Sequence, residues 1–96
     1  MGKFVSKARE LRQQLREQTR GRELISLTDV AKELTRRLRA QQSARYRQRS
    51  VNPRTIGRLE LNRAQEPDME VVTALADFYQ ELGFDGSRVY FYDPHA

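Results

Sequence analysis

The chain carries four stripes of apolar residues spaced three or four positions apart, which is the spacing of one face of an α-helix. They predict helices over residues 3–19, from 26 to about 40 or 42, over 53–60 and over 68–82, the first ending near Gly21 and the last at Gly83. The expected core residues are Phe4 or Val5, Ala8, Leu11 and Leu15; Val30, Ala31, Leu34 and Leu38; Ile56 and Leu59; and Val72, Leu75, Ala76, Tyr79 and Leu82. The pattern predicts an all-α fold, a small bundle of four to five helices.

Three of these helices begin with residues that cap a helix N-terminus. Ser26 is followed three positions later by Asp29, as in a capping box, so the second helix is predicted to start at Ser26. Asn52 precedes Pro53, whose missing N–H costs nothing in the first turn of a helix. Asp68 is the expected cap of the last helix.

Residues 84–96 form an extension after the last helix. The segment between Gly86 and Asp93 is short, aromatic and β-prone, so it predicts either a strand or a final turn that covers the core. Alternatively, it pairs with its copy in a second subunit, because an edge strand is a template for partner addition. The candidate dimer contacts are Val89, Tyr90, Phe91 and Tyr92.

The helix over residues 53–60 has a polar face opposite its apolar face. At about 100° per residue, Arg54 and Arg58 lie away from Ile56 and Leu59. Guanidinium groups on such a face can pair with base edges, and each good bidentate pair discriminates between bases by roughly 1–3 kcal/mol. Gly57, on the flank, allows close approach either to DNA or to a neighbouring helix. The plainer interpretation is a solvated amphipathic helix with ordinary surface arginines.

Three segments, in this order and spacing, resemble the lambda-repressor/Cro-like helix-turn-helix family, also called the XRE family. Residues 26–31 are similar to its first motif helix, with Ala31 at the small position where two helices cross. Residues 51–60, VNPRTIGRLE, are similar to its recognition helix, with Asn62 and Arg63 in the turn after it. Residues 67–78 are similar to the helix that closes the domain.

The resemblance implies that the protein reads double-stranded DNA as a homodimer, with two recognition helices about 34 Å apart in successive major grooves. It also implies an ion pair between Arg12 or Arg16 and Glu60. The candidates for base reading are Arg54, Thr55 and Arg58. The candidates for phosphate binding are Ser26 and Thr28, at a helix N-terminus that favours anions, and Asn52, Asn62, Arg63, Arg45, Arg47 and Arg49.

The chain departs from that family at two places. Leu27 stands where the family often has a polar residue that reaches DNA. Residues 35–50, TRRLRAQQSARYRQRS, separate the two motif helices where the family has a tight turn; we call them the basic insertion. Residues 43–50 show no apolar stripe and predict a mobile loop. Its arginines either follow the DNA backbone or enter the minor groove, becoming ordered on binding, or they are merely solvated.

Charge is distributed unevenly along the chain, whose net charge is +5. Residues 35–65 hold nine Arg and one Glu, whereas residues 66–96 hold one Arg and seven Asp or Glu. This polarity would orient a domain on a polyanion and speed its approach. Alternatively, the basic and acidic segments neutralise each other within the fold.

Composition excludes several kinds of protein. Ninety-six residues predict one domain, 1–96, and there is no cysteine for a disulfide or a thiolate metal site. No apolar run could span a bilayer and no signal peptide is evident, so a cytoplasmic, nucleoid-associated protein is expected. His95, the only histidine, lies in the terminal tail. We therefore expect no catalytic residues, no metal, no cofactor, no membrane partner and no small-molecule ligand.

The sequence thus favours a sequence-specific transcriptional regulator, a repressor that occludes a near-palindromic operator. Three alternatives stay open: a chromosome-organising DNA-binding protein of low specificity, an antitoxin-like module whose acidic C-terminus binds a protein, and an RNA binder that uses the basic insertion.

Overall fold

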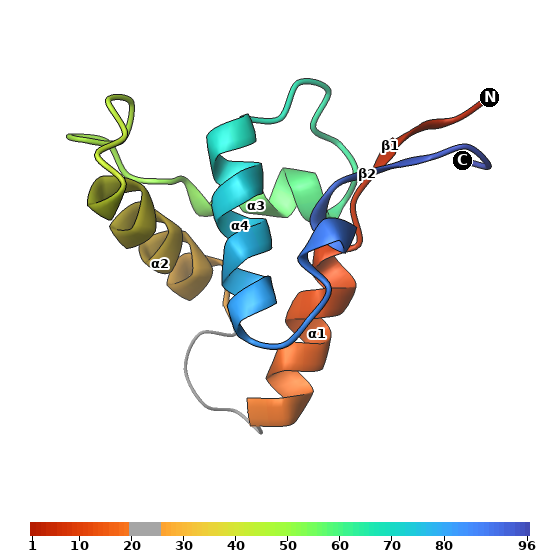
Figure 1. The fold of residues 1–96 in the computed structure, drawn as a ribbon, viewed down its shortest axis with the longest axis horizontal. Coiled ribbons are helices and arrows are strands. Elements are labelled where there is room, and N and C mark those ends of the chain that lie inside the picture. The colour runs from red at the N-terminus through yellow and green to blue at the C-terminus, as the bar shows by residue number, and fades with distance from the viewer. Residues whose placement is uncertain (20–25) are drawn as a thin grey trace.

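The computed structural model describes residues 1–19 and 26–96, so the predicted helix end near Gly21 lies outside the described residues. In chain order the elements are β1 (Lys3–Val5), α1 (Ala8–Thr19), α2 (Leu27–Ala40), α3 (Pro53–Glu60), α4 (Met69–Glu81), the 3₁₀-helix η1 (Gly86–Val89) and β2 (Phe91–Asp93). Figure 1 shows the helices gathered around α4, with the two strands at one edge. The predicted fold class, a small helical bundle with a short C-terminal strand, is confirmed.

The three predicted N-caps are confirmed. The Ser26 side chain accepts a hydrogen bond from the Asp29 N–H, 3.0 Å away. Asn52 Oδ1 accepts from the N–H of Arg54 at 2.9 Å, and Asp68 Oδ1 accepts from the N–H of Glu70 at 2.9 Å. Each side chain satisfies an N–H that has no partner within its helix, which fixes where the helix begins.

The helices α2, α3 and α4 end with the same backbone arrangement. The residues in the left-handed region are Gln42, Asn62 and Gly83, with φ values of 61°, 57° and 91°. After α4, Gly83 donates to the carbonyl of Gln80 and Phe84 donates to that of Tyr79, which is a Schellman motif. The predicted stop at Gly83 is therefore confirmed.

The N-terminus differs from the prediction, because residues 3–5 are a strand and α1 begins only at Ala8. β1 and β2 pair antiparallel, with Phe4 opposite Tyr92, and both termini lie at this edge of the molecule (Figure 1). Phe4 is 58% exposed and stacks on the ring of Tyr90 instead of joining the core. The β-prone triplet was assigned to the helix because its strand partner lies almost ninety positions away in the sequence.

The C-terminal extension includes a strand, one of the forms expected from the sequence, and this strand pairs with β1 of the same chain. The expected dimer contact at Val89 is wrong, because this side chain is fully buried against the helices. Tyr92 is 55% exposed, and Tyr90 and Phe91 are partly buried.

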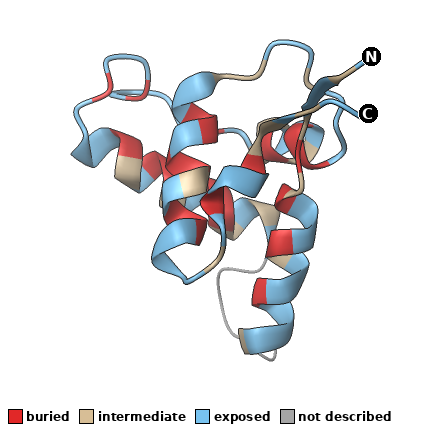
Figure 2. Ribbon diagram, turned by 45° about the vertical axis from the view of Figure 1, so that its right-hand side comes forward, coloured by how far each residue is buried: buried red, intermediate tan, exposed pale blue. Residues whose placement is uncertain are grey.

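The core lies where α1, α2, α3, α4 and η1 meet, and Figure 2 shows the buried positions on their inward sides. Its largest fully buried side chains are Tyr79, Leu34, Leu38, Ile56, Leu75, Val30, Val71 and Val89. Most residues of the predicted stripes are buried, but Phe4 and Leu82 are exposed and Val5 and Ala76 are only partly buried. Helix α4 also buries Val71, Ala74 and Phe78, which the stripe did not include. None of the described helices is long and apolar enough to cross a membrane.

Candidate nucleic-acid interface

The inner face of α3 is fixed by apolar packing and by one charged contact. Ile56 and Leu59 are buried, and Glu60 is only 6% exposed. Arg12 of α1 donates from Nε to Glu60 Oε2 at 2.7 Å and from Nη2 to Oε1 at 3.0 Å. The expected ion pair is confirmed and is made by Arg12, while Arg16 is exposed. The hydrogen bond to Glu60 raises the pKa of Arg12, although burial acts in the opposite direction.

The close approach at Gly57 serves helix packing. A Cβ atom at this position would lie 3.3 Å from Cδ1 of Leu27. Leu27, the first residue of α2, is partly buried against the core. Therefore α3 lies against the start of α2, and the two predicted motif helices are adjacent.

The outer face of α3 carries exposed arginines. Arg54 and Arg58 are exposed, and so is Arg63 just beyond the helix end. Thr55, Arg58 and Arg63 line one groove of about 430 Å³, together with residues 64–68 of the loop that leads to α4. The structure therefore brings two base-reading candidates and one phosphate-binding candidate to the same groove.

Only some of the arginines in residues 35–65 are neutralised by carboxylates. Arg36 pairs with Glu33, Arg37 with Glu33 and Glu81, and Arg45 with Asp68 and Glu70. Among the arginines of residues 35–65, all of which the structure describes, those without a carboxylate partner are Arg39, Arg47, Arg49, Arg54, Arg58 and Arg63. Carboxylates therefore neutralise only a minority of the arginines in residues 35–65.

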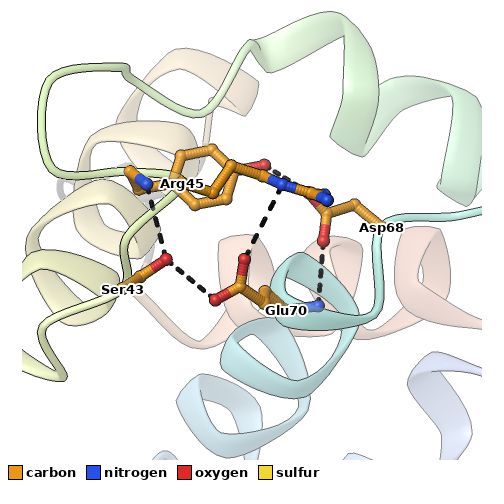
Figure 3. A network of polar contacts seen from close by, with 5 residues as sticks. Ser43, Arg45, Asp68 and Glu70 are labelled. Atoms are coloured by element: carbon orange, nitrogen blue, oxygen red, sulfur yellow. Dashed lines mark hydrogen bonds and ion pairs between the residues drawn. The ribbon is translucent and has the colours of Figure 1, made fainter.

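The loop between α2 and α3, residues 41–52, is held against the start of α4. Tyr46 is 8% exposed, and its hydroxyl donates to Asp68 Oδ2. The hydroxyl of Ser43 donates to Glu70 Oε1 at 2.8 Å, and Figure 3 shows these contacts side by side. Arg39 donates to the carbonyl of Tyr46 and to that of Arg49, each at 3.1 Å.

Residues 43–50 form a loop, as predicted, but this loop has fixed partners elsewhere in the fold. Tyr46 joins the core, and carboxylates more than twenty positions away hold the loop. A pattern search within the segment could not find these partners, because they lie on another helix.

Burial is the largest cause that raises the pKa of Tyr46, to about 12, followed by its hydrogen bond to Asp68. Burial also acts to raise the pKa of Asp68. Hydrogen bonds from Tyr46, Arg45 and the backbone of Glu70 outweigh it, so the pKa of Asp68 is lowered.

Two of the phosphate-binding candidates have other partners. Arg45 donates from Nη1 to Asp68 Oδ2 at 2.8 Å, which ties the loop to α4. Asn62 accepts from the N–H of Ser6 at 2.6 Å and donates to its carbonyl at 3.3 Å. Both assignments are corrected, because these side chains fasten segments of the fold. Figure 3 shows Arg45 beside Asp68 and Glu70.

The other phosphate-binding candidates stay at the surface. The side chain of Ser26 accepts from the backbone N–H of Asp29, as in a capping box, and its hydroxyl also donates to the Asp29 carboxylate. Thr28 and Asn52 are exposed, and Asn52 also caps α3.

No family model matches the chain. No curated protein or solved structure is significantly similar to it either.

Two features of the structure were not predicted from the sequence. The guanidinium of Arg39, for which the sequence predicts no role, donates to the loop backbone. Tyr79 is a core residue, as predicted, but its buried hydroxyl has no hydrogen-bond partner among the described residues. Burial raises the pKa of Tyr79, and the charge of Glu60 adds to this effect. Neither feature has a local sequence signal, since both depend on tertiary neighbours.

Proposed function

We propose that this chain is a sequence-specific double-stranded DNA-binding regulator that inserts α3 into the major groove. The observation that carries the proposal is the division of α3 into two faces. Arg12 and the core hold Glu60 and the apolar side chains on one face, whereas Arg54 and Arg58 project from the other. The major groove, about 12 Å wide, admits an α-helix and presents a distinct donor and acceptor pattern for each base pair.

The roles of the outer side chains follow from their positions. Arg54, in the first turn of α3, is proposed to make the bidentate contact to guanine, with Arg58 one turn further along. Thr55 is partly exposed between them and suits a phosphate or a thymine methyl group. Arg63, beyond the helix end, is proposed to bind phosphate, which positions the protein without specifying sequence.

The resemblance to the lambda-repressor/Cro-like family supports a repressor that acts by occlusion as a two-fold dimer on a near-palindromic operator. The surface proposed for the dimer contact comprises Phe91 and Tyr92 with Tyr90 beside them; the ring centroids of Phe4 and Tyr92 lie 5.5 Å apart. Sedimentation of the protein alone and on duplex DNA tests this point: a dimer in the DNA complex is expected, and a strict monomer under both conditions would contradict it.

The function itself is tested by selection from a randomised duplex-DNA pool, with a matched RNA pool in parallel. Salt is fixed at a physiological concentration, because phosphate contacts alone produce strong, sequence-independent affinity at low salt. An enriched near-palindrome is the expected result. Retention of DNA without a consensus would favour a chromosome-organising protein, and enrichment of RNA alone would overturn the proposal. Retention of neither pool would point to a protein partner.

A further inference from the structure

We propose that the loop of residues 41–52 is a preformed binding site for phosphodiester groups of the DNA duplex. These groups flank the major groove into which α3 is proposed to insert. The inference rests on the proposed function. It adds a binding site in which Arg39, Arg47 and Arg49 supply the positive charge, and from which Arg45 is excluded by its pairing with Asp68.

Two hollows in this region are lined by side chains that can bind an anion. The first, of about 340 Å³, is lined by Arg39, Gln42, Ser43 and Arg47. The second, of about 330 Å³, is lined by Ala44, Arg45, Arg47, Gln48 and Arg49, of which Arg45 is already paired with Asp68. These described linings contain guanidinium, amide and hydroxyl groups and no carboxylate. Arg47 is common to both hollows.

The groove beside α3 differs from these hollows. Glu66 and Asp68 belong to its lining, so a phosphate there would face negative charge as well as Arg58 and Arg63. Among the described pockets on the basic side, the two at the loop are the ones that suit an anion by charge alone.

The loop holds its shape before any ligand arrives. Its start is fixed by the Schellman bond from the Ser43 N–H to the Leu38 carbonyl at 3.0 Å. Its end is fixed by the bond from the Val51 N–H to Thr35 Oγ1 at 2.9 Å. Tyr46 anchors its middle in the core. Arginines on a fixed loop lose less conformational entropy on binding than arginines on a disordered tail.

The loop is also within reach of the backbone that flanks α3. Arg49 precedes Arg54 by five positions, so their Cα atoms are at most about 18 Å apart. The major groove of DNA is about 12 Å wide. When Arg54 lies in this groove, the phosphates at its edges are therefore no farther from Arg54 than Arg49 can be. The neighbourhood of α3 and the charge of the hollows therefore point to the same ligand, the sugar-phosphate backbone.

The test compares three proteins on the selected duplex and on a scrambled duplex of the same length, with fluorescence anisotropy over a range of NaCl concentrations. They are the wild type, the double variant Arg47→Gln/Arg49→Gln, and the control Arg9→Gln/Arg16→Gln. The control removes the same charge from exposed residues of α1. Thermal unfolding checks that all three proteins are folded.

The expected result is a salt slope of the logarithm of affinity that falls by about 2 in the loop variant, roughly one for each arginine. Affinity should fall by the same factor on both duplexes, because phosphate contacts carry no sequence information. The control should keep the salt slope of the wild type.

An unchanged slope with retained sequence preference would overturn this inference and leave the proposed function standing. A loss of preference in the loop variant would also overturn it, because the loop would then read bases. If the wild type binds neither duplex, both proposals are wrong.

Discussion

The helix α3 and the loop of residues 41–52 present the same kind of charge but are held in place by different interactions. Buried apolar side chains and the Arg12–Glu60 pair fix α3. The loop is fixed by one buried ring, that of Tyr46, and by polar contacts, among them hydrogen bonds to Asp68 and Glu70; Arg45, one of the donors, is half exposed. The comparison indicates that α3 can move only if the core is disrupted, whereas the loop can detach while the helices stay folded.

The largest effect is expected for Arg12→Ala. It leaves the carboxylate of Glu60 buried, with a side chain only 3% exposed, and without its guanidinium partner. Breaking a buried pair from one side costs about 3–5 kcal/mol, so the free energy of unfolding should fall by about 3 kcal/mol. Denaturant unfolding monitored by circular dichroism measures it.

The reverse variant and a neighbour serve as controls for Arg12→Ala. Glu60→Ala should be less destabilising, because the Arg12 side chain is 20% exposed and can turn to water. Arg16→Ala, on the same helix and exposed, should change stability by less than about 0.5 kcal/mol. Equal losses for Arg12→Ala and Arg16→Ala would show that the buried pair does not fix α3.

A smaller effect is expected for Tyr46→Phe, which removes the hydroxyl that donates to Asp68 but keeps the buried ring. A hydrogen bond to a charged group contributes roughly 1.5–3 kcal/mol to stability, so the free energy of unfolding should fall by about 2 kcal/mol. Amide hydrogen exchange should show faster exchange in residues 41–50 and little change in α3. Faster exchange throughout the molecule would contradict an independently held loop.

Tyr46→Phe should also change the response to alkaline pH. The folded protein raises the pKa of Tyr46 to about 12, compared with about 10 in an unfolded chain. The contribution of the protonated Tyr46 hydroxyl to folding stability is therefore fully present below pH 10 and is lost as the pH rises towards 12. Tyr79, whose pKa is also raised, contributes equally to both proteins. The stability difference between wild type and variant should shrink above pH 10.

Asp68→Asn should lower the free energy of unfolding by about 1 kcal/mol at neutral pH. Asparagine caps a helix about as well as aspartate, so the variant loses only the charge that faces Tyr46 and Arg45. The pKa of Asp68 is lowered, so its stabilisation is present above about pH 4 and is lost as the pH falls further. Thermal unfolding from pH 6 to pH 3 should show the two proteins converging. A constant difference would exclude this role of the carboxylate.

The sequence predicted α3 well because its signals are local. Asn52, Pro53 and the spacing of Ile56 and Leu59 define where the helix begins and which face is buried. The partner of Glu60 came from the resemblance to a family, since a contact between α1 and α3 has no local signature. The structure then distinguished Arg12 from Arg16.

The loop and the termini could not be predicted in the same way. Tyr46 is one aromatic residue in a basic run, and its burial depends on Asp68, which lies on another segment. β1 has three residues and gains its hydrogen bonds only when β2 arrives from the other end of the chain. Such short elements are determined by tertiary partners more than by their own propensity.

The central claim, that the outer face of α3 reads base sequence, is tested most directly by Arg54→Ala. The dissociation constants of the wild type and the variant are measured at one fixed salt concentration on the selected duplex and on a scrambled duplex. The preference for the selected duplex should fall roughly 5- to 150-fold, which corresponds to the 1–3 kcal/mol of one bidentate base contact. Equal weakening on both duplexes would contradict it, because Arg54 would then bind only the backbone.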